Sequence, residues 1–385
     1  MKNLVKAEDN RSFGKKLLGF IGNNTVPIMF IIICIVCIPL SGFSLSYLAN
    51  EIVTRMGRNL FLILCLLIPI MAGMGLNFGM TLGAMAGEIA LIIVADSQIW
   101  GIPGIIAAMI ISIPLSVLLG FFCGKVLNMS RGREMITSYI ISYVFNGIYQ
   151  LVVLYMMGSI IPIKHTSIKL PRGYGIRNTV SLLNMRQSLD NLLAININGV
   201  KIPVLTFLIV GVLCIFIVWF RKTKLGQDMR AVGQDQEVAR DAGIDVDKTR
   251  IISMVMSTVI AGFGMIIYLQ NMGNISTYSS HSQIGMFCIA ALLVGGASVD
   301  KANIGNVFLG VILFHTMFIV APKAGAAITG DSMIGEYFRV FVSYGVITVA
   351  LIMYEAKKRR AKAGAGRELA AAQAAEDGGA ANEDK

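Results

Sequence analysis

The feature that most constrains this chain is a set of long stretches that contain no Asp, Glu, Lys or Arg. A helix that crosses a membrane needs about 20 mostly apolar residues. Six of these uncharged stretches are Leu17–Asn50, Asn59–Gly87, Ser97–Gly124, Met135–Ile163, Ile251–Val299 and Ala302–Pro322. Several of them are therefore long enough for one membrane helix, and at least one must hold two.

Bulk composition agrees with this interpretation. The chain is 55% hydrophobic and only 14% charged, whereas soluble domains carry roughly 25% charged residues. A soluble fold could not cover so much apolar surface, because much of any globule faces water. We therefore predict an all-α integral membrane protein.

Ten membrane spans fit the apolar runs. We place them at residues 26–48, 60–76, 79–96, 101–124, 136–158, 202–220, 251–270, 284–299, 303–321 and 335–354. Glycines interrupt the second and third spans at Gly73, Gly75, Gly79 and Gly83. That boundary is therefore either a broken helix or a re-entrant one.

Basic residues predict the orientation, because short cytoplasmic flanks are enriched in Lys and Arg. With ten spans, four basic segments fall on one side: the N-terminal residues, the loop near 125–135, residues 221–250 and the end of the last span. This side should be the cytoplasm, with both termini there. The segment 159–201 holds six basic residues and falls outside, but long loops follow the rule less strictly. The net charge of +11 fits this topology better than nucleic-acid binding.

These spans divide the chain into three parts. Residues 1–25 form a cytoplasmic N-terminal segment, and 26–354 form the transmembrane domain. Within it lie an extracytoplasmic loop, 159–201, and a cytoplasmic loop, 221–250. The last residues, 355–385, end in an Ala-, Gly- and acid-rich stretch with nothing to bury, which predicts a disordered cytoplasmic tail.

The cytoplasmic loop 221–250 carries a predicted short helix, Gln234–Ala242. Asp235 and Glu237 lie near its N-terminus and Arg240 near its C-terminus, as the helix dipole favours. Gly243 is placed to end it. On these grounds alone, a solvated loop without a partner is as well supported as a docking element.

The pattern R-A-V-G-Q-D-x-x-x-A-R-x-x-G-I, residues 230–244, resembles the coupling loop of bacterial ABC importer permeases of the ribose, nucleoside and branched-chain amino acid class. The resemblance implies the type II importer fold of this translocator family, and a helix that docks into a groove on a separate ATPase. Asp235 departs from the family, which often has Asn there. The implied coupling residues are Arg230, Gly233, Gln234, Gln236, Ala239, Arg240, Gly243 and Ile244.

Three further segments are similar to this family. Gly75–Leu91 resembles its glycine-rich third span, and Gly132–Ile148 looks more like the nucleoside-type members than the sugar-type ones. Leu293–Phe314 resembles its G-G-x-S segment, although Asp300 and Lys301 stand where the family commonly has small residues. Substrate identity stays open between a nucleoside and a simple sugar, with a vitamin or amino acid also within the class.

No motif for catalysis or cofactor binding accompanies these segments. The chain has no G-x-x-x-x-G-K-[ST] phosphate loop. His165, His281 and His315 are scattered without a metalloprotease spacing. The resemblance implies that ATP and Mg²⁺ belong to a partner ATPase, so we expect no catalytic residue, metal or cofactor in this chain.

Polar residues inside the spans are candidates for the translocation pathway. Glu88 is the acidic residue well inside a predicted span, at a cost of roughly 2.5–3.5 kcal/mol on insertion scales. Asn146, Tyr149 and Gln150 share a face of the fifth span, where they suit a sugar or base ring. Each is equally able to hold neighbouring helices together. The candidates are Asn77, Phe78, Glu88, Asn146, Tyr149 and Gln150.

We therefore expect a permease subunit of an ATP-driven importer, which the resemblance implies to be in the bacterial cytoplasmic (inner) membrane. By resemblance, its partners are an ABC ATPase, a second permease chain (identical or related), an extracytoplasmic substrate-binding protein and a small-molecule substrate. The alternative is a secondary transporter driven by an ion gradient, with Glu88 as the coupling carboxylate. A membrane enzyme lacks a catalytic constellation here, whereas a membrane scaffold without transport stays open.

Overall fold

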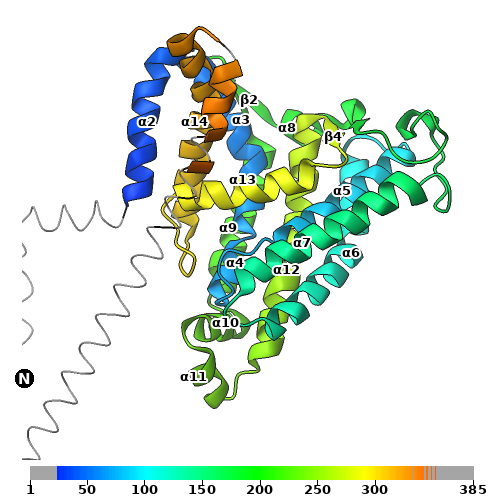
Figure 1. Cartoon of the computed structure of the whole chain (residues 1–385), viewed down its shortest axis with the longest axis vertical. Coiled ribbons are helices and arrows are strands. Elements are labelled where there is room, and N and C mark those ends of the chain that lie inside the picture. Colours follow the sequence, from blue (N-terminus) through cyan, green and yellow to red (C-terminus); the bar gives the residue numbers. More distant parts are fainter. Residues whose placement is uncertain (1–23, 332, 342–343, 346–347, 349–351, 353–385) are drawn as a thin grey trace, which may run out of the picture.

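The computed structural model describes residues 24–331, 333–341, 344–345, 348 and 352, and this part of the chain is mostly helical (Figure 1). The longer helices are α2 (Thr25–Ser41), α3 (Leu45–Leu64), α5 (Met80–Asp96), α6 (Gly101–Met129), α7 (Glu134–Leu151), α9 (Val204–Phe220), α10 (Lys224–Gln234), α12 (Val246–Met272), α13 (Ser280–Val294) and α14 (Ile304–Thr329). The short ones are α4 (Leu67–Met71), α8 (Ser188–Leu192), α11 (Gln236–Asp241), a π-turn (Val152–Met156) and two 3₁₀ turns (Thr166–Ile168 and Leu183–Met185).

Four short strands correct the expectation of an all-α chain. They are β1 (Thr179–Ser181), β2 (Ala194–Ile197), β3 (Val200–Pro203) and β4 (Asn274–Ser276). β1 pairs with β4 and β2 pairs with β3, both antiparallel. The strands lie in the polar segments between apolar helices, where pairing satisfies N–H and C=O groups of the extended backbone.

Five helical stretches in the described part are long and apolar enough to cross a membrane. They are Leu45–Met71, Gly101–Met129, Glu134–Met156, Val246–Met272 and Ile304–Thr329. The pair α9 and α10, bent by 74°, is a sixth candidate. α2 and α13 are shorter apolar helices, and α5 is an apolar helix buried along nearly its whole length. The chain is thus a mostly helical multi-pass protein with five or six candidate spans by length and composition.

The first predicted spans have different limits in the structure. α2 ends at Ser41 and the chain turns at Gly42, which has a φ of +66°. α3 then starts at Leu45, well before the predicted residue 60, because its charged residues find partners: Arg55 pairs with Glu51, and Arg58 Nη1 donates to Asn271 Oδ1 over 3.3 Å. Charge therefore did not mark a loop here.

The predicted ends of the chain fall largely outside the described residues. Residues 1–23 and 353–385 are not described, so the expectations for the N-terminal segment and for the tail are untested. In the predicted last span, 335–354, the described residues are helical, from 333 to 341 and again at 344–345, 348 and 352.

Close helix packing sets the centre of the molecule. α5, α6 and α12 pack against one another, and the α5 glycines face the α12 backbone. A Cβ on Gly83 would come 2.1 Å from the Thr258 carbonyl oxygen, and one on Gly87 2.4 Å from that of Gly262. Small residues four apart let membrane helices approach this closely. The glycine-rich stretch of the sequence thus places α5 in the interior.

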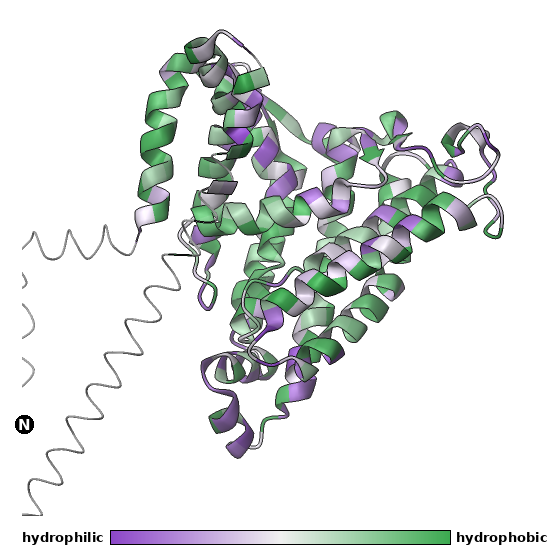
Figure 2. Ribbon diagram, viewed as in Figure 1, coloured by the Kyte–Doolittle hydropathy of each residue, from purple (hydrophilic) through white to green (hydrophobic). Residues whose placement is uncertain are grey.

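Hydrophobic and hydrophilic residues lie in different parts of the molecule (Figure 2). Exposed apolar side chains cover the outer faces of several helices, including Ile35 of α2, Ile110 of α6 and Ile215 of α9. Hydrophilic residues gather at two ends of the molecule. One, called here the α11 end, carries α10 and α11; the other, called the strand end, carries residues 157–203 and β4 (Figures 1 and 2).

A buried carboxylate anchors the strand end to the helices. Asp190 of α8 accepts hydrogen bonds from Thr206 of α9 (2.5 Å) and, through its other oxygen, from Asn271 (2.7 Å) and Gln270 (3.2 Å) of α12. Unpaired, a buried carboxylate would be costly. Its three donors therefore fix the 157–203 segment against α9 and α12.

Candidate functional site

Three of the predicted pathway residues meet in a buried polar cluster between α5, α7 and α13. Glu88 Oε2 lies 2.9 Å from Nδ1 of His281, and Nε2 of the same ring lies 2.9 Å from Asn146 Oδ1. Gln150 Nε2 donates to that Asn146 oxygen over 3.3 Å. Both Glu88 and His281 are 0% exposed. One hydrogen-bonded chain therefore connects three helices, and its centre is His281.

The oxygens around His281 decide which proton arrangement satisfies it. Both ring nitrogens face oxygen atoms. A neutral ring has one N–H donor, whereas a ring protonated on both nitrogens donates twice. As oriented, both ring nitrogens face acceptor oxygens, an arrangement that an imidazolium beside the Glu88 carboxylate would satisfy. Turning the Asn146 amide would suit the neutral ring instead.

Two polar atoms of the cluster stay without a hydrogen-bond partner in the described chain. They are Glu88 Oε1 and the Tyr149 hydroxyl, both buried; the two groups lie close enough to interact with each other, although not at hydrogen-bond distance. The Tyr149 ring meets His281 edge to face, with centroids 4.9 Å apart. Buried polar atoms without partners are rare and point to a ligand, a water or a functional role.

A cavity of about 240 Å³ lies beside this cluster. Aromatic rings line one part of it and hydroxyl and amide groups the rest: Phe78, Thr81, Tyr139, Ser142, Tyr143, Asn146, Ser282, Gln283, Met286 and Tyr344. Asn146 belongs to both cavity and cluster. Tyr139 and Tyr143 are 40% and 64% exposed, so the aromatic side of the cavity opens outward.

The six pathway candidates take different places around this cavity. Phe78 and Asn146 line it, while Glu88, Tyr149 and Gln150 lie behind it in or against the cluster. Asn77 turns away: its Oδ1 accepts from the Gly79 N–H over 2.7 Å, and its amide lies 2.9 Å from Met254 Sδ. Asn77 thus shapes the turn into α5.

The loop 221–250 folds into two helices rather than the single predicted one. Thr223 caps α10 by accepting from the Gly226 N–H, and Asp235 caps α11 by accepting from Glu237 and Val238. The predicted helix Gln234–Ala242 is therefore shorter, at Gln236–Asp241, and α10 precedes it. Side-chain caps at Thr and Asp are strongly favoured helix starts, and Thr223 was the signal for α10.

The eight predicted coupling residues divide into exposed and packed ones. Ala239 is 2% exposed and packs with Val232 and Val246, with Ile244 against them. Gln236 is half-buried. The exposed members are Arg230, Gly233, Gln234, Arg240 and Gly243. Val238, which was not predicted, is a large apolar residue that is 64% exposed on α11.

Gly233 holds α10 against the end of the α3–α4 stretch. A Cβ on Gly233 would come 2.2 Å from the Met71 carbonyl oxygen, and one on Gly73 2.9 Å from Gly233 Cα. Gly73 also has a φ of +73°, which L side chains rarely adopt. Two glycines 160 positions apart in the numbering therefore allow backbone-to-backbone contact between α10 and the α4 turn.

A buried arginine links α11 to α7. Arg250 of α12 is 0% exposed; its Nη1 donates to Gln236 Oε1 over 3.0 Å and its Nη2 to Glu134 Oε1 over 2.7 Å. Gln236 begins α11 and Glu134 begins α7. The guanidinium thus bridges the short helix and the helix that carries Asn146.

Sequence reasoning missed three residues of these sites. His281 has no carboxylate near it in sequence, so its pairing with Glu88 depends on how α5 and α13 pack. Arg250 stands beside other charged residues and resembles ordinary flanking charge. Val238 was detectable, because it is an apolar residue on a short polar helix.

Long apolar helices packed around a buried polar cluster are typical of integral membrane transport proteins, where intramembrane charges mark functional sites. The family model described as "Branched-chain amino acid transport system / permease component" matches residues 59–351. The chain belongs to this family. It is thus an ABC transporter permease component, which is not itself catalytic.

Named relatives in this family import different solutes. The chain is 26% identical over 296 residues to the nucleoside ABC transporter permease protein NupB of Lactococcus lactis, covering 73% of this chain and 72% of that one. It is 26% identical to the xylose transport system permease protein XylH of Haemophilus influenzae, over 42% of this chain and 41% of XylH. It is 29% identical to the L-arabinose transport system permease protein AraH of Escherichia coli, over 43% of this chain and 48% of AraH. The match thus spans less than half of the two sugar permeases. No solved structure matches the chain significantly.

Proposed function

We propose that this chain forms half of the translocation pathway of an ATP-driven importer for a nucleoside or simple sugar. The observation that carries the proposal is the cavity beside the Glu88–His281–Asn146 cluster in a chain of this permease family. Aromatic rings stack on base or sugar faces, and amide and hydroxyl groups bond their polar edges. NupB, a relative named for nucleosides, is matched over much of its length.

The size and exposure of the cavity support a second permease subunit. At about 240 Å³, the cavity is smaller than the roughly 300–1,000 Å³ of ordinary ligand pockets. Its exposed wall carries Tyr139 and Tyr143 of α7. A second copy or a related chain facing α7 would close the cavity from that side.

Ten spans and a cytoplasmic α11 end are part of the same proposal. Besides the long helices, α2, α5, α9 and α13 would cross as shorter spans, and the helix from 333 onward as the tenth. α10 and α11 would then lie at the cytoplasmic face with both termini, and the strand end would face the substrate-binding protein. The basic residues at the predicted cytoplasmic loops support this orientation.

Coupling would run from a separate ATPase through α11. Its exposed residues, including Val238 and Arg240, would sit in the ATPase groove, while Ala239 and Ile244 hold the helix in shape. Arg250 would pass movement of α11 to the start of α7 through Gln236 and Glu134. ATP and Mg²⁺ would be bound by the ATPase.

Purification and reconstitution test the proposal. Mild extraction from native membranes should recover the chain with an ABC ATPase and a binding protein. Vesicles containing that complex should take up labelled nucleoside or pentose when ATP is supplied on the ATPase side. Uptake that follows a pH or Na⁺ gradient without ATP would instead establish the gradient-driven carrier, and recovery with neither protein and no uptake would favour a scaffold.

A further inference from the structure

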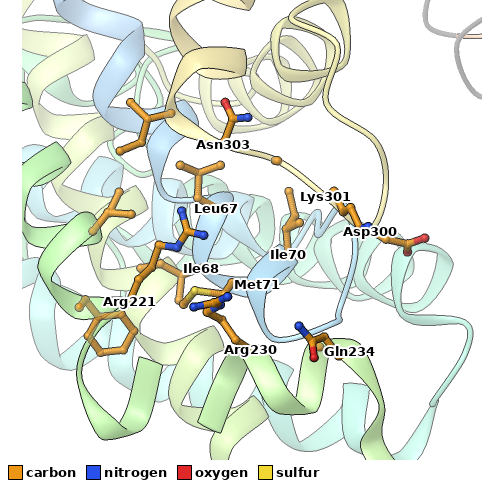
Figure 3. Close-up of a pocket in the computed structure, with 15 residues that line it drawn as sticks. Leu67, Ile68, Ile70, Met71, Arg221, Arg230, Gln234, Asp300, Lys301 and Asn303 are labelled. Carbon is orange, nitrogen blue, oxygen red and sulfur yellow. The ribbon is translucent and has the colours of Figure 1, made fainter. Parts of the chain in front are cut away.

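A cavity of about 770 Å³ lies at the α11 end, outside the site described above (Figure 3). α4, the end of α9, α10 and the residues just before α14 enclose it. Apolar side chains form one part of its lining: Leu67, Ile68, Ile70, Met71, Ile217, Phe220 and Ile304. The other part is polar, and its cations are Arg221, Arg230 and Lys301.

The charges of this cavity favour an anion. Figure 3 shows Arg221 and Arg230 on the same side, next to Ile68 and Met71, with Lys301 and Asp300 across Ile70. Asp300 also lines the cavity, and this acidic residue already has an interaction partner within the chain. Within the described residues, Arg221, Arg230 and Lys301 form no ion pair. Guanidinium groups bind phosphate through paired N–H donors.

The apolar part of the cavity selects among anions. α9 is apolar along its length and ends at Phe220, after which Arg221 and Lys222 begin the charged loop. Val218 and Trp219, just before that end, are 47% and 60% exposed. An exposed Trp followed by basic residues is typical of a membrane–water boundary. The cavity therefore lies where a lipid phosphate would meet Arg221 and its acyl chain would meet Phe220.

We propose that this cavity binds one anionic phospholipid, with its phosphate between Arg221 and Arg230 and an acyl chain against Ile70 and Phe220. Basic pockets between helices at a membrane face bind such headgroups. Because Arg230 belongs to α10 and Ile70 to α4, the lipid bridges the two elements that meet at Gly233 and Gly73. Bound lipid thus steadies the contact through which α10 holds the α4 turn.

Native mass spectrometry of the purified chain in detergent tests this binding without any ATPase. The probes are phosphatidylglycerol and phosphatidylcholine with the same acyl chains. We expect phosphatidylglycerol to bind about tenfold tighter or more, and Arg221→Gln/Arg230→Gln to remove that preference, because each basic residue near a lipid surface contributes about 1 kcal/mol. Lys222→Gln is the matched control, since Lys222 is exposed beside Arg221 but does not line the cavity.

A second variant leaves every charge in place. Ala302→Trp would fill the cavity from its lining, and it should weaken phosphatidylglycerol binding to the same extent as the double arginine variant. Excess inorganic phosphate should not displace the lipid, because phosphate does not use the apolar wall.

Three results would overturn the proposal. The first is equal binding of the two lipids by the wild-type chain. The second is phosphatidylglycerol binding by Arg221→Gln/Arg230→Gln that is as tight as in the wild type. If that variant keeps its lipid but no longer captures the ATPase, the cavity serves an acidic segment of the ATPase instead. The third is full displacement by inorganic phosphate, which would mark a site for free anions.

Discussion

Glu88 and His281 lie 193 positions apart in the chain, yet their side chains meet at 2.9 Å in the packed interior. The pair joins α5 to α13, and the far side of the His281 ring reaches Asn146 of α7. A buried carboxylate is costly unless it is paired. The pair thus explains how α5 can carry Glu88 among glycines and apolar residues.

Substitutions of Glu88 distinguish two roles for this residue: accepting a structural hydrogen bond, and carrying the charge that proton-coupled transport would need. In Glu88→Gln, the amide oxygen can still accept a hydrogen bond from His281. We therefore expect ATP-dependent uptake within about threefold of the wild type, which is a smaller change than the loss of one ordinary hydrogen bond would cause. In Glu88→Ala, His281 loses its acceptor at a cost of about 1–3 kcal/mol, and both thermal stability and uptake should fall.

Uptake into vesicles and thermal unfolding in detergent measure these two effects. If Glu88→Gln is as inactive as Glu88→Ala while its thermal stability is normal, the negative charge itself is required. That outcome would favour the carrier driven by an ion gradient.

The contact between Gly233 and the α4 turn predicts a second result. Gly233→Ala places a Cβ 2.2 Å from the Met71 carbonyl oxygen, so α10 must move away from α4. We expect ATP hydrolysis by the assembled complex to persist while uptake drops by about tenfold or more, because overpacking of a tight contact costs about 1–3 kcal/mol.

Gly211→Ala in α9 is the matched control for that change. A Cβ there meets nothing within 4 Å, and alanine favours a helix over glycine by about 1 kcal/mol, so uptake should stay normal. Normal uptake by Gly233→Ala as well would show that the α10–α4 contact does not carry the coupling.

Arg250 provides the third test. Lysine carries a single ammonium group in place of the planar fork that reaches Gln236 and Glu134 together. Arg250→Lys should therefore keep most of the ATPase capture but lower uptake per ATP hydrolysed, measured as the ratio of the two rates in the same vesicles. The expected loss is about tenfold, since one charged hydrogen bond is worth about 1.5–3 kcal/mol.

Arg131→Lys is the control for Arg250→Lys. Arg131 pairs with Asp247, whose side chain is 56% exposed, and exposed ion pairs contribute only about 0–1 kcal/mol. Its uptake ratio should match the wild type. If the two variants behave alike, Arg250 stabilises the fold without transmitting movement.

Val238 tests the ATPase-docking surface. It is 64% exposed on α11, and an apolar residue that becomes buried at an interface contributes about 1.5–3 kcal/mol. Val238→Asp should therefore lower recovery of the ATPase during purification. Leu193→Asp, at the strand end and 52% exposed, should leave recovery unchanged. Equal recovery with both variants would place the docking surface elsewhere.

The local sequence determined a large part of this structure. Uncharged stretches predicted most of the long helices, because a spanning helix must satisfy its own backbone and present apolar side chains to lipid. The acidic residues Asp235 and Glu237 and the stop at Gly243 predicted α11 to within two residues at its start. These features depend only on neighbours a few positions away.

Tertiary structure decided the partners of the charged residues. Glu51, Arg55 and Arg58 lie between the first two predicted spans, but Arg58 reaches Asn271 and α3 continues through all three. Glu88, Asn146, Tyr149 and Gln150 were identifiable as polar residues in apolar spans, whereas His281 at their centre was not. The sequence alone determined most of the long helices and some of the polar residues that they bury. Which buried polar groups pair is decided only when α5, α7 and α13 pack, because each pair is made between helices and leaves no periodic signal along the chain.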